Sequence, residues 1–121
     1  MSVKSYRELT VWQKSIALAE RIYVASKAFP KEESFGLTSQ MRRAAVSVPS
    51  NIAEGAAREG TGEFLQFLSI AQGSLAELDT QLLLAERLGY LKAAQVRDLE
   101  HACDEIGRML SGLRKSLKQS G

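Results

Sequence analysis

The chain has 121 residues, of which 45% are hydrophobic and 25% are charged, a balance that excludes a disordered chain and predicts one globular domain over residues 1–121. The formal net charge of +2 is milder than a dedicated nucleic-acid-binding domain usually carries. One cysteine excludes an intrachain disulfide, and since the sequence shows neither an apolar signal segment nor about 20 consecutive apolar residues, we expect a cytoplasmic protein that does not span a membrane.

Four segments repeat hydrophobic residues at spacings of three and four, which is typical of amphipathic helices. The first, residues 10–29, carries two apolar stripes instead of one, and Pro30 ends it. Ser34 and Thr38 are both residue types that cap helices, so either predicts the N-terminus of the second helix.

The second segment, residues 35–57, contains Pro49 inside a surface of small residues. Proline donates no backbone hydrogen bond, so we expect the helix to bend there at a cost of roughly 3 kcal/mol. The hydroxyls of Ser47 and Ser50 and the amide of Asn51 are near enough in sequence to bond the freed backbone groups. The alternative is two short helices separated at Val48, because residues before proline avoid the helical region.

The third segment, residues 62–88, has the most regular apolar seam, and Gly89 ends it. The fourth segment, residues 92–118, repeats the seam and places Cys103 on it, where a small buried hydrophobe is the preferred interpretation. Because the connections are short, successive helices run antiparallel. The predicted fold is therefore all-α, an antiparallel up-down-up-down four-helix bundle.

The apolar residues exceed what one bundle needs. Leu65, Ala76 and Leu83 lie about 100° around the third helix from its seam, which leaves a surface for a partner. We therefore expect a homo-oligomer, with these three residues as candidate interface residues. The alternative is that the extra stripes only widen the core of a monomer.

The sequence offers little for catalysis or metal binding. A di-iron bundle needs paired histidine ligands, whereas His101 is the only histidine, and its neighbours Asp98 and Glu105 are typical of a solvated charge cluster. Glu54, close to the predicted bend, is more consistent with a pair to Arg58 than with acid–base chemistry. We expect a nonenzymatic protein with no catalytic residue, no metal and no cofactor.

The distribution of charge is more informative than its sum. After Glu105 the chain carries only basic residues, and two arginines stand on the otherwise uncharged start of the second helix. In a symmetric oligomer such patches repeat and attract phosphate backbone. The alternative is that cations favour helix C-termini or border subunit interfaces whatever the function. The candidate nucleic-acid-binding residues are Arg42, Arg43, Arg58, Arg108, Arg114, Lys115 and Lys118.

The segment 42–55, RRAAVSVPSNIAEG, carries a family resemblance. Further matching segments are LTVWQ at 9–13, GLTSQ at 36–40, FLQFL at 64–68, GSLAEL at 73–78 and LGYL at 88–91. With them the chain resembles the bacterial four-helix-bundle proteins that are encoded in 23S rRNA intervening sequences. The family motif residues in this chain are Pro49, Ser50, Asn51, Glu54 and Gly55.

Members of that family are similar to the accessory proteins of diversity-generating retroelements, which form pentamers and bind a reverse transcriptase and nucleic acid. The resemblance therefore implies a four-helix subunit, a pentamer and association with RNA, and it supplies no catalytic residue. Two hypotheses follow. The chain is either a sequence-indifferent binder of RNA or DNA backbone, or a scaffold that docks another polypeptide such as a polymerase without touching nucleic acid.

Overall fold

The computed structural model describes residues 5–120. Within that range the chain is helical and contains no strand, which confirms the predicted class. The elements are η1 (Tyr6–Glu8), α1 (Thr10–Ser26), η2 (Lys31–Glu33), α2 (Leu37–Ala56), α3 (Thr61–Arg87) and α4 (Ala93–Ser120). The four α-helices start and end within three residues of the predicted bounds.

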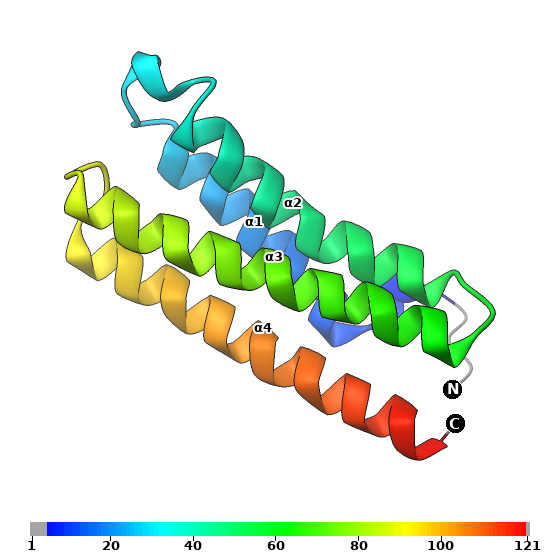
Figure 1. Ribbon diagram of the computed structural model, residues 1–121. Helices are drawn as coiled ribbons and strands as arrows, with labels where there is room; N and C mark the ends of the chain where they lie inside the picture. Colours follow the sequence, from blue (N-terminus) through cyan, green and yellow to red (C-terminus); the bar gives the residue numbers. More distant parts are fainter. Residues whose placement is uncertain (1–4, 121) are drawn as a thin grey trace.

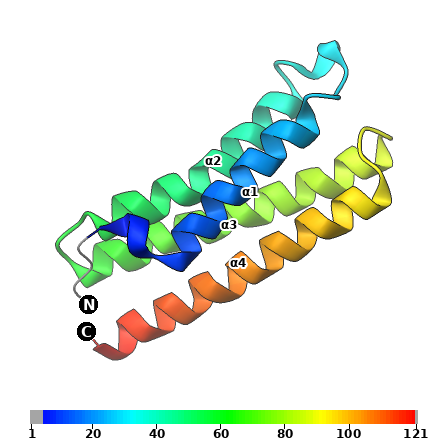
Figure 2. The same ribbon diagram turned by 180° about the vertical axis from the view of Figure 1, so that it is seen from behind.

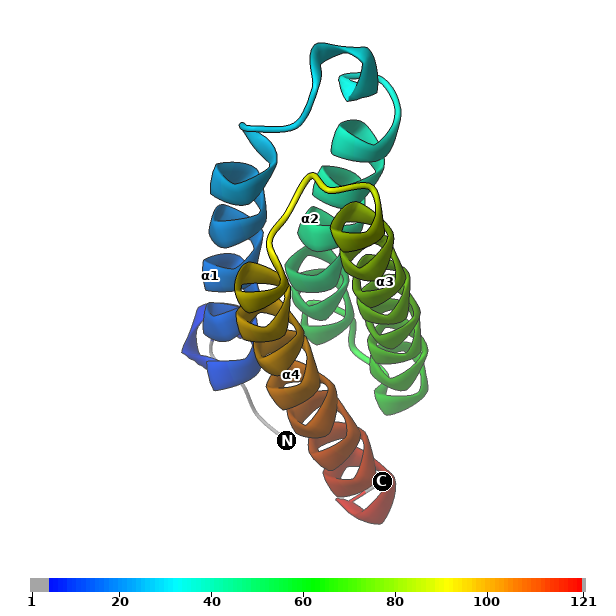
Figure 3. The same ribbon diagram turned by 90° about the vertical axis from the view of Figure 1, so that its left-hand side faces the viewer.

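The four helices alternate in direction and lie side by side (Figure 1). Each of α1 and α3 packs against both α2 and α4, whereas over residues 5–120 the backbones of α1 and α3, and those of α2 and α4, do not approach each other closely. The pairs α1–α3 and α2–α4 are therefore the diagonals of the bundle, as the view towards its end shows (Figure 3). The start of α1 and the end of α4 lie at the same end (Figure 2).

One hydrophobic core runs along the inside of this bundle. Its largest fully buried side chains are Ile22, Met41, Val48, Ile52, Leu68, Leu78, Leu82, Val96, Ile106 and Leu110. Cys103 lies in the same core, as the sequence predicts. Over the described range, none of the helices combines the length and the apolar character needed to cross a bilayer.

Helix α2 continues through Pro49 without interruption. The alternative of two short helices separated at Val48 is therefore wrong, and Val48 and Pro49 are both buried inside the helix. A buried ring with many neighbours offsets the lost backbone hydrogen bond by packing. The bend at Pro49 stays a prediction.

The connection between α1 and α2 differs from the prediction. Neither Ser34 nor Thr38 caps α2, because the carboxylate of Glu33 accepts the backbone N–H of Leu37 at 3.1 Å. The other carboxylate oxygen accepts the hydroxyl of Tyr90, from the α3–α4 turn, at 2.8 Å. One carboxylate therefore links two turns at the same end of the bundle.

Helix α1 ends at Ser26, three residues before the predicted end. The reason lies in tertiary contacts: Phe29 leaves the helix to pack on Tyr90, with ring centroids 5.3 Å apart. Arg42 of α2 donates to the hydroxyl of Ser26 at 2.8 Å and to the carbonyl of Tyr23 at 3.3 Å. A guanidinium on the last carbonyls stabilises a helix C-terminus.

Helix α3 ends as predicted at Gly89, whose φ of 80° lies in the left-handed region that favours glycine. The N–H of Tyr90 reaches the carbonyl of Ala85 at 2.9 Å, and that of Gly89 reaches Glu86 at 3.0 Å. These two bonds form a Schellman motif, which turns the chain sharply into α4.

Candidate nucleic-acid interface

Charged residues are unevenly distributed along the α3–α4 hairpin. Residues 64–76 of α3 carry no charged side chain, and residues 106–120 of α4, which run alongside them, carry four basic residues and no acidic one. We call these two segments together the basic end. Residues 77–105, which include the turn, carry seven acidic and three basic residues and form the acidic end.

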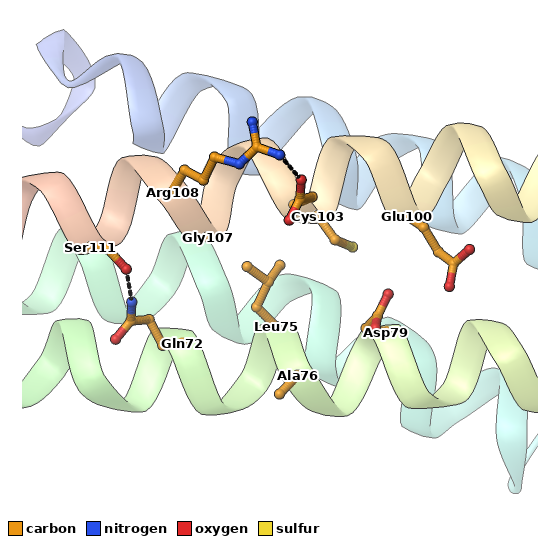
Figure 4. A pocket seen from close by; sticks show the side chains of 10 residues that line it. Gln72, Leu75, Ala76, Asp79, Glu100, Cys103, Gly107, Arg108 and Ser111 are labelled. Carbon is orange, nitrogen blue, oxygen red and sulfur yellow. Dashed lines mark hydrogen bonds and ion pairs between the residues drawn. The ribbon is translucent and has the colours of Figure 1, made fainter.

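An amide links the two helices within the basic end. The side chain of Gln72 donates to the hydroxyl of Ser111 at 3.0 Å and accepts from the guanidinium of Arg114 (Figure 4 shows the first bond). The Nε of Arg114 is buried and has no partner among residues 5–120. The link therefore holds Arg114 against α3.

A groove of about 550 Å³ lies between α3 and α4 where the two ends meet. Its floor is made of the side chains of Leu75, Ala76 and Cys103 and of Gly107. Carboxylates line its acidic part, and Gln72 and Arg108 line the other (Figure 4). The groove therefore presents both signs of charge over a narrow apolar floor. Its acidic residues are Asp79, Glu100 and Asp104.

The thiol of Cys103 opens onto this groove but is not activated. Burial, together with the nearby carboxylates of Asp79 and Glu100, raises its pKa to about 12. A nucleophilic or metal-binding cysteine needs its thiolate near neutral pH. Cys103 is therefore a packing residue, in agreement with the sequence interpretation.

The predicted cations fall into two groups. Arg108, Arg114, Lys115 and Lys118 gather at the basic end on one helix, although Arg108 is paired with Asp104. No acidic side chain within the described range lies in ion-pair distance of the other three.

Of the remaining three cations, two lie on α2 and the third lies just past its end. Arg42 is committed to the end of α1, with its guanidinium 4.6 Å from the ring centroid of Tyr23. Arg58, just past the end of α2, pairs with Glu54 at 3.3 Å and with Glu63 at 3.9 Å. Arg43 is exposed but stands on the other half of the bundle. The structure therefore brings together only the four cations of α4.

The VPSNIAEG segment packs α2 tightly on α3. A Cβ at Gly55 would lie 2.7 Å from the Cβ of Phe67 and 3.0 Å from a ring carbon of Phe64, so glycine is required for this close approach. The amide of Asn51 donates to the carbonyl of Ser47 at 2.8 Å and to its hydroxyl at 2.9 Å. These contacts give Gly55 and Asn51 a structural role.

The hydroxyl of Ser74 connects the VPSNIAEG segment of α2 to α3. The hydroxyls of Ser47 and Ser74 lie 2.8 Å apart, so Asn51, Ser47 and Ser74 form one chain of hydrogen bonds between α2 and α3. Glu54 pairs with Arg58 as the sequence predicts, and Ser50 is exposed.

This helical arrangement and its motif match known proteins. The sequence matches the 23S rRNA-intervening sequence protein family over residues 7–112. The chain belongs to this family. A crystal structure at 1.70 Å resolution, of a protein with unknown function from the S23 ribosomal protein family of Bacteroides thetaiotaomicron, is similar with a TM-score of 0.79 and 26% sequence identity, over 88% of this chain and 99% of that one. No curated protein matches the sequence.

The family description names no enzymatic activity. In the part of this family member that the structure describes, no three acidic, cysteine or histidine side chains gather closely enough to hold a metal ion. His101 and Asp98 line a shallow, open depression on α4 together with Arg97. Glu105, the third residue of the predicted cluster, pairs instead with Lys14 of α1 at 3.3 Å.

The three candidate interface residues differ in exposure. Leu65 is half-buried and packs against the core, so for this residue the alternative of a wider core holds. Ala76 is exposed beside the groove, and Leu83 keeps 44% of its surface exposed. Surplus apolar surface therefore remains on α3.

The sequence interpretation missed Gln72 and Ser111. Both are uncharged polar residues within long helices. They are 39 residues apart in sequence, so no local pattern predicts that their side chains form a hydrogen bond. The one available signal is that residues 64–76 lack charge on a helix that is otherwise rich in it.

Proposed function

We propose that this protein is a nonenzymatic, homo-oligomeric bundle protein that binds RNA or DNA backbone through its basic end, with a pentamer as the assembly that the family resemblance implies. The observation that supports this is the absence of any acidic residue from residues 64–76 and 106–120, beside four cations. Unopposed Lys and Arg bind phosphates and release counterions, which favours association in low salt.

Backbone contact fits the basic end better than base recognition does. Stacking on bases needs exposed aromatic rings, whereas Phe64 is buried and Phe67 lies under the guanidinium of Arg58, 5.2 Å from the ring centroid. Serine hydroxyls, the Gln72 amide and flexible lysines remain, and these bind phosphate and sugar without reading sequence. We expect little preference for sequence.

Repetition around a symmetry axis strengthens the proposal. Four cations on one subunit make a weak field, but a ring of subunits multiplies it on one face. The exposed leucines of α3 provide apolar surface for that assembly.

The test is a binding titration over a range of salt concentrations, with single-stranded RNA, structured RNA and duplex DNA as probes. We expect the logarithm of affinity to fall linearly with the logarithm of salt, and the double variant Lys115→Gln/Lys118→Gln to lower that slope by about 0.7 per lost contact on single strands. The control is Lys31→Gln/Lys92→Gln, which removes the same charge from the opposite end of the bundle. Equal effects of both variants, or no binding in low salt, would contradict the proposal.

A second candidate function is a protein scaffold. The observation that favours it is Phe35, whose side chain is completely exposed on the α1–α2 connection. A large exposed aromatic is typical of a docking residue for another polypeptide. Absence of nucleic-acid binding in low salt, together with an intact oligomer, would support the scaffold.

A further inference from the structure

The groove between α3 and α4 has room for part of another molecule. Its volume of about 550 Å³ lies within the range of ligand-binding clefts. Ala76 of α3 and Gly107 of α4 line it beside Leu75 and Cys103. Because alanine carries only a methyl group and glycine carries no side chain, an incoming segment can come close to both helices at this point.

An apolar strip extends the groove along α3. Leu65 lies 11 residues before Ala76 and Leu83 lies 7 residues after it, which are about three and two helical turns, so all three residues are on one side of the helix. Leu83 keeps 44% of its surface exposed, and Leu65 is half-buried. From Leu65 to Leu83 the strip is about 27 Å long at 1.5 Å per residue, which is the length of a helix of about 18 residues.

Two carboxylates of the groove have no cationic partner. Asp79 of α3 and Glu100 of α4 extend into the space between the helices (Figure 4), and within residues 5–120 neither of them forms an ion pair. Asp104, the third carboxylate of the groove, is paired with Arg108. Burial is the main cause of the raised pKa of the Cys103 thiol, and Asp79 and Glu100 add to it, so their charge acts on the groove floor. A ligand for this part of the groove therefore needs a positive charge.

This charge favours a polypeptide over a nucleic acid, because carboxylates repel phosphate and attract Lys and Arg. A second copy of the chain matches the strip poorly, since its helices already bury their apolar stripes in that copy's own core. A helix whose apolar stripe is free can lie along the groove and cover the strip.

We propose that the α3–α4 groove docks an amphipathic helix of another polypeptide, with the apolar stripe of that helix on the strip from Leu65 to Leu83 and its basic residues beside Asp79 and Glu100. This inference goes beyond the proposed binding of nucleic acid, because the carboxylates of the groove select the partner and the basic end does not. The two proposals can therefore fail separately.

The docked helix leaves apolar surface for subunit assembly. Leu65, Ala76 and Leu83 are the candidate subunit-interface residues of the sequence, and here they bind the partner helix instead. Ile70 and Leu88, which are 46% and 48% exposed, lie about 120° around α3 from Ala76. A homo-oligomer and a docked helix are therefore compatible.

The test measures the binding of two designed peptides of about 18 residues by fluorescence anisotropy at one salt concentration. Both peptides repeat leucine at helical spacing, and the leucines are flanked by lysines in one peptide and by glutamates in the other. The wild-type protein should bind the lysine peptide about tenfold more tightly, because weak attraction in one complex and weak repulsion in the other add up. Equal affinities, or tighter binding of the glutamate peptide, would overturn the proposal.

The double variant Asp79→Lys/Glu100→Lys should reverse this preference. The matched control is Glu20→Lys/Asp98→Lys, which makes the same change in net charge in a separate depression between α1 and α4 and should keep the preference of the wild type. A control that reverses the preference as strongly would mean that net charge alone attracts the peptide, and the groove would then have no special role.

Ala76→Gln tests the apolar strip without a change of charge, and its exposed position makes it a safe variant if the charge reversal disturbs the fold. It should weaken the binding of the lysine peptide about fivefold, because an uncompensated polar group would be covered, and an unchanged affinity would contradict the proposal. Native mass spectrometry tests whether a second copy occupies the groove instead. Dissociation of a wild-type oligomer by Asp79→Lys/Glu100→Lys, with the control still assembled, would assign the groove to the subunit interface and overturn the proposal.

Discussion

Gly55 offers the sharpest prediction about the fold, because two opposing effects can be weighed there. Replacing a helical glycine with alanine stabilises a helix by about 0.5 to 1 kcal/mol. At Gly55, however, the new methyl would lie 2.7 Å from the Cβ of Phe67. That Cβ is fixed to the α3 backbone, so the helices must separate, and overpacking of this kind costs about 1 to 3 kcal/mol.

We therefore expect Gly55→Ala to destabilise the protein by about 1 kcal/mol, which lowers the midpoint of thermal unfolding by about 4 °C in a chain of this length. The matched control is Gly112→Ala in α4, where a Cβ would meet no atom within 4 Å, and this variant should be more stable than the wild type. Thermal unfolding followed by circular dichroism at a fixed protomer concentration measures both. A stabilising effect of the same size in both variants would refute the argument from close packing.

Three further predictions concern single side chains. Hydrogen bonds from Leu37 and Tyr90 lower the pKa of Glu33 below its ordinary value of 4.5. The stability that Glu33 contributes is therefore present above pH 4.5 and is lost as the pH falls through the lowered pKa. Glu33→Gln should flatten this acid dependence of stability in unfolding titrations, and an unchanged dependence would contradict the prediction. Cys103, buried and with a pKa of about 12, should react with a thiol reagent only after unfolding in denaturant, and fast labelling of the native protein would show that the structure is open there. Asn51→Ala should cost about 1 kcal/mol in chemical denaturation through the lost bonds to Ser47, with the oligomer retained; loss of the oligomer at unchanged stability would place Asn51 at an interface instead.

Most of the fold could be predicted from local patterns. Four apolar seams fixed the number of helices, and Gly89 marked its turn because a left-handed residue there has almost no substitute. The Glu54–Arg58 pair was also predictable from local sequence, since residues four apart on a helix are neighbours.

What the sequence could not show was set by tertiary contacts. The carboxylate of Glu33 caps α2 from outside the helix. Arg42 binds Ser26, 16 residues away at the end of α1, so the sequence alone suggested that its charge was free to bind a ligand. Gln72 was invisible for the same reason, because its partners are on another helix. The candidate site was therefore predictable as a run of cations on α4 but not as a surface shared with α3.

Native mass spectrometry of the wild-type protein with a short single-stranded RNA, recorded at increasing concentrations of ammonium acetate, tests assembly and RNA binding together. We expect an oligomer that carries RNA in low salt and the same oligomer without RNA in high salt, since phosphate contacts weaken with salt while apolar subunit contacts do not. A protein that is monomeric throughout, or an oligomer that carries no RNA even in the lowest salt, would contradict it.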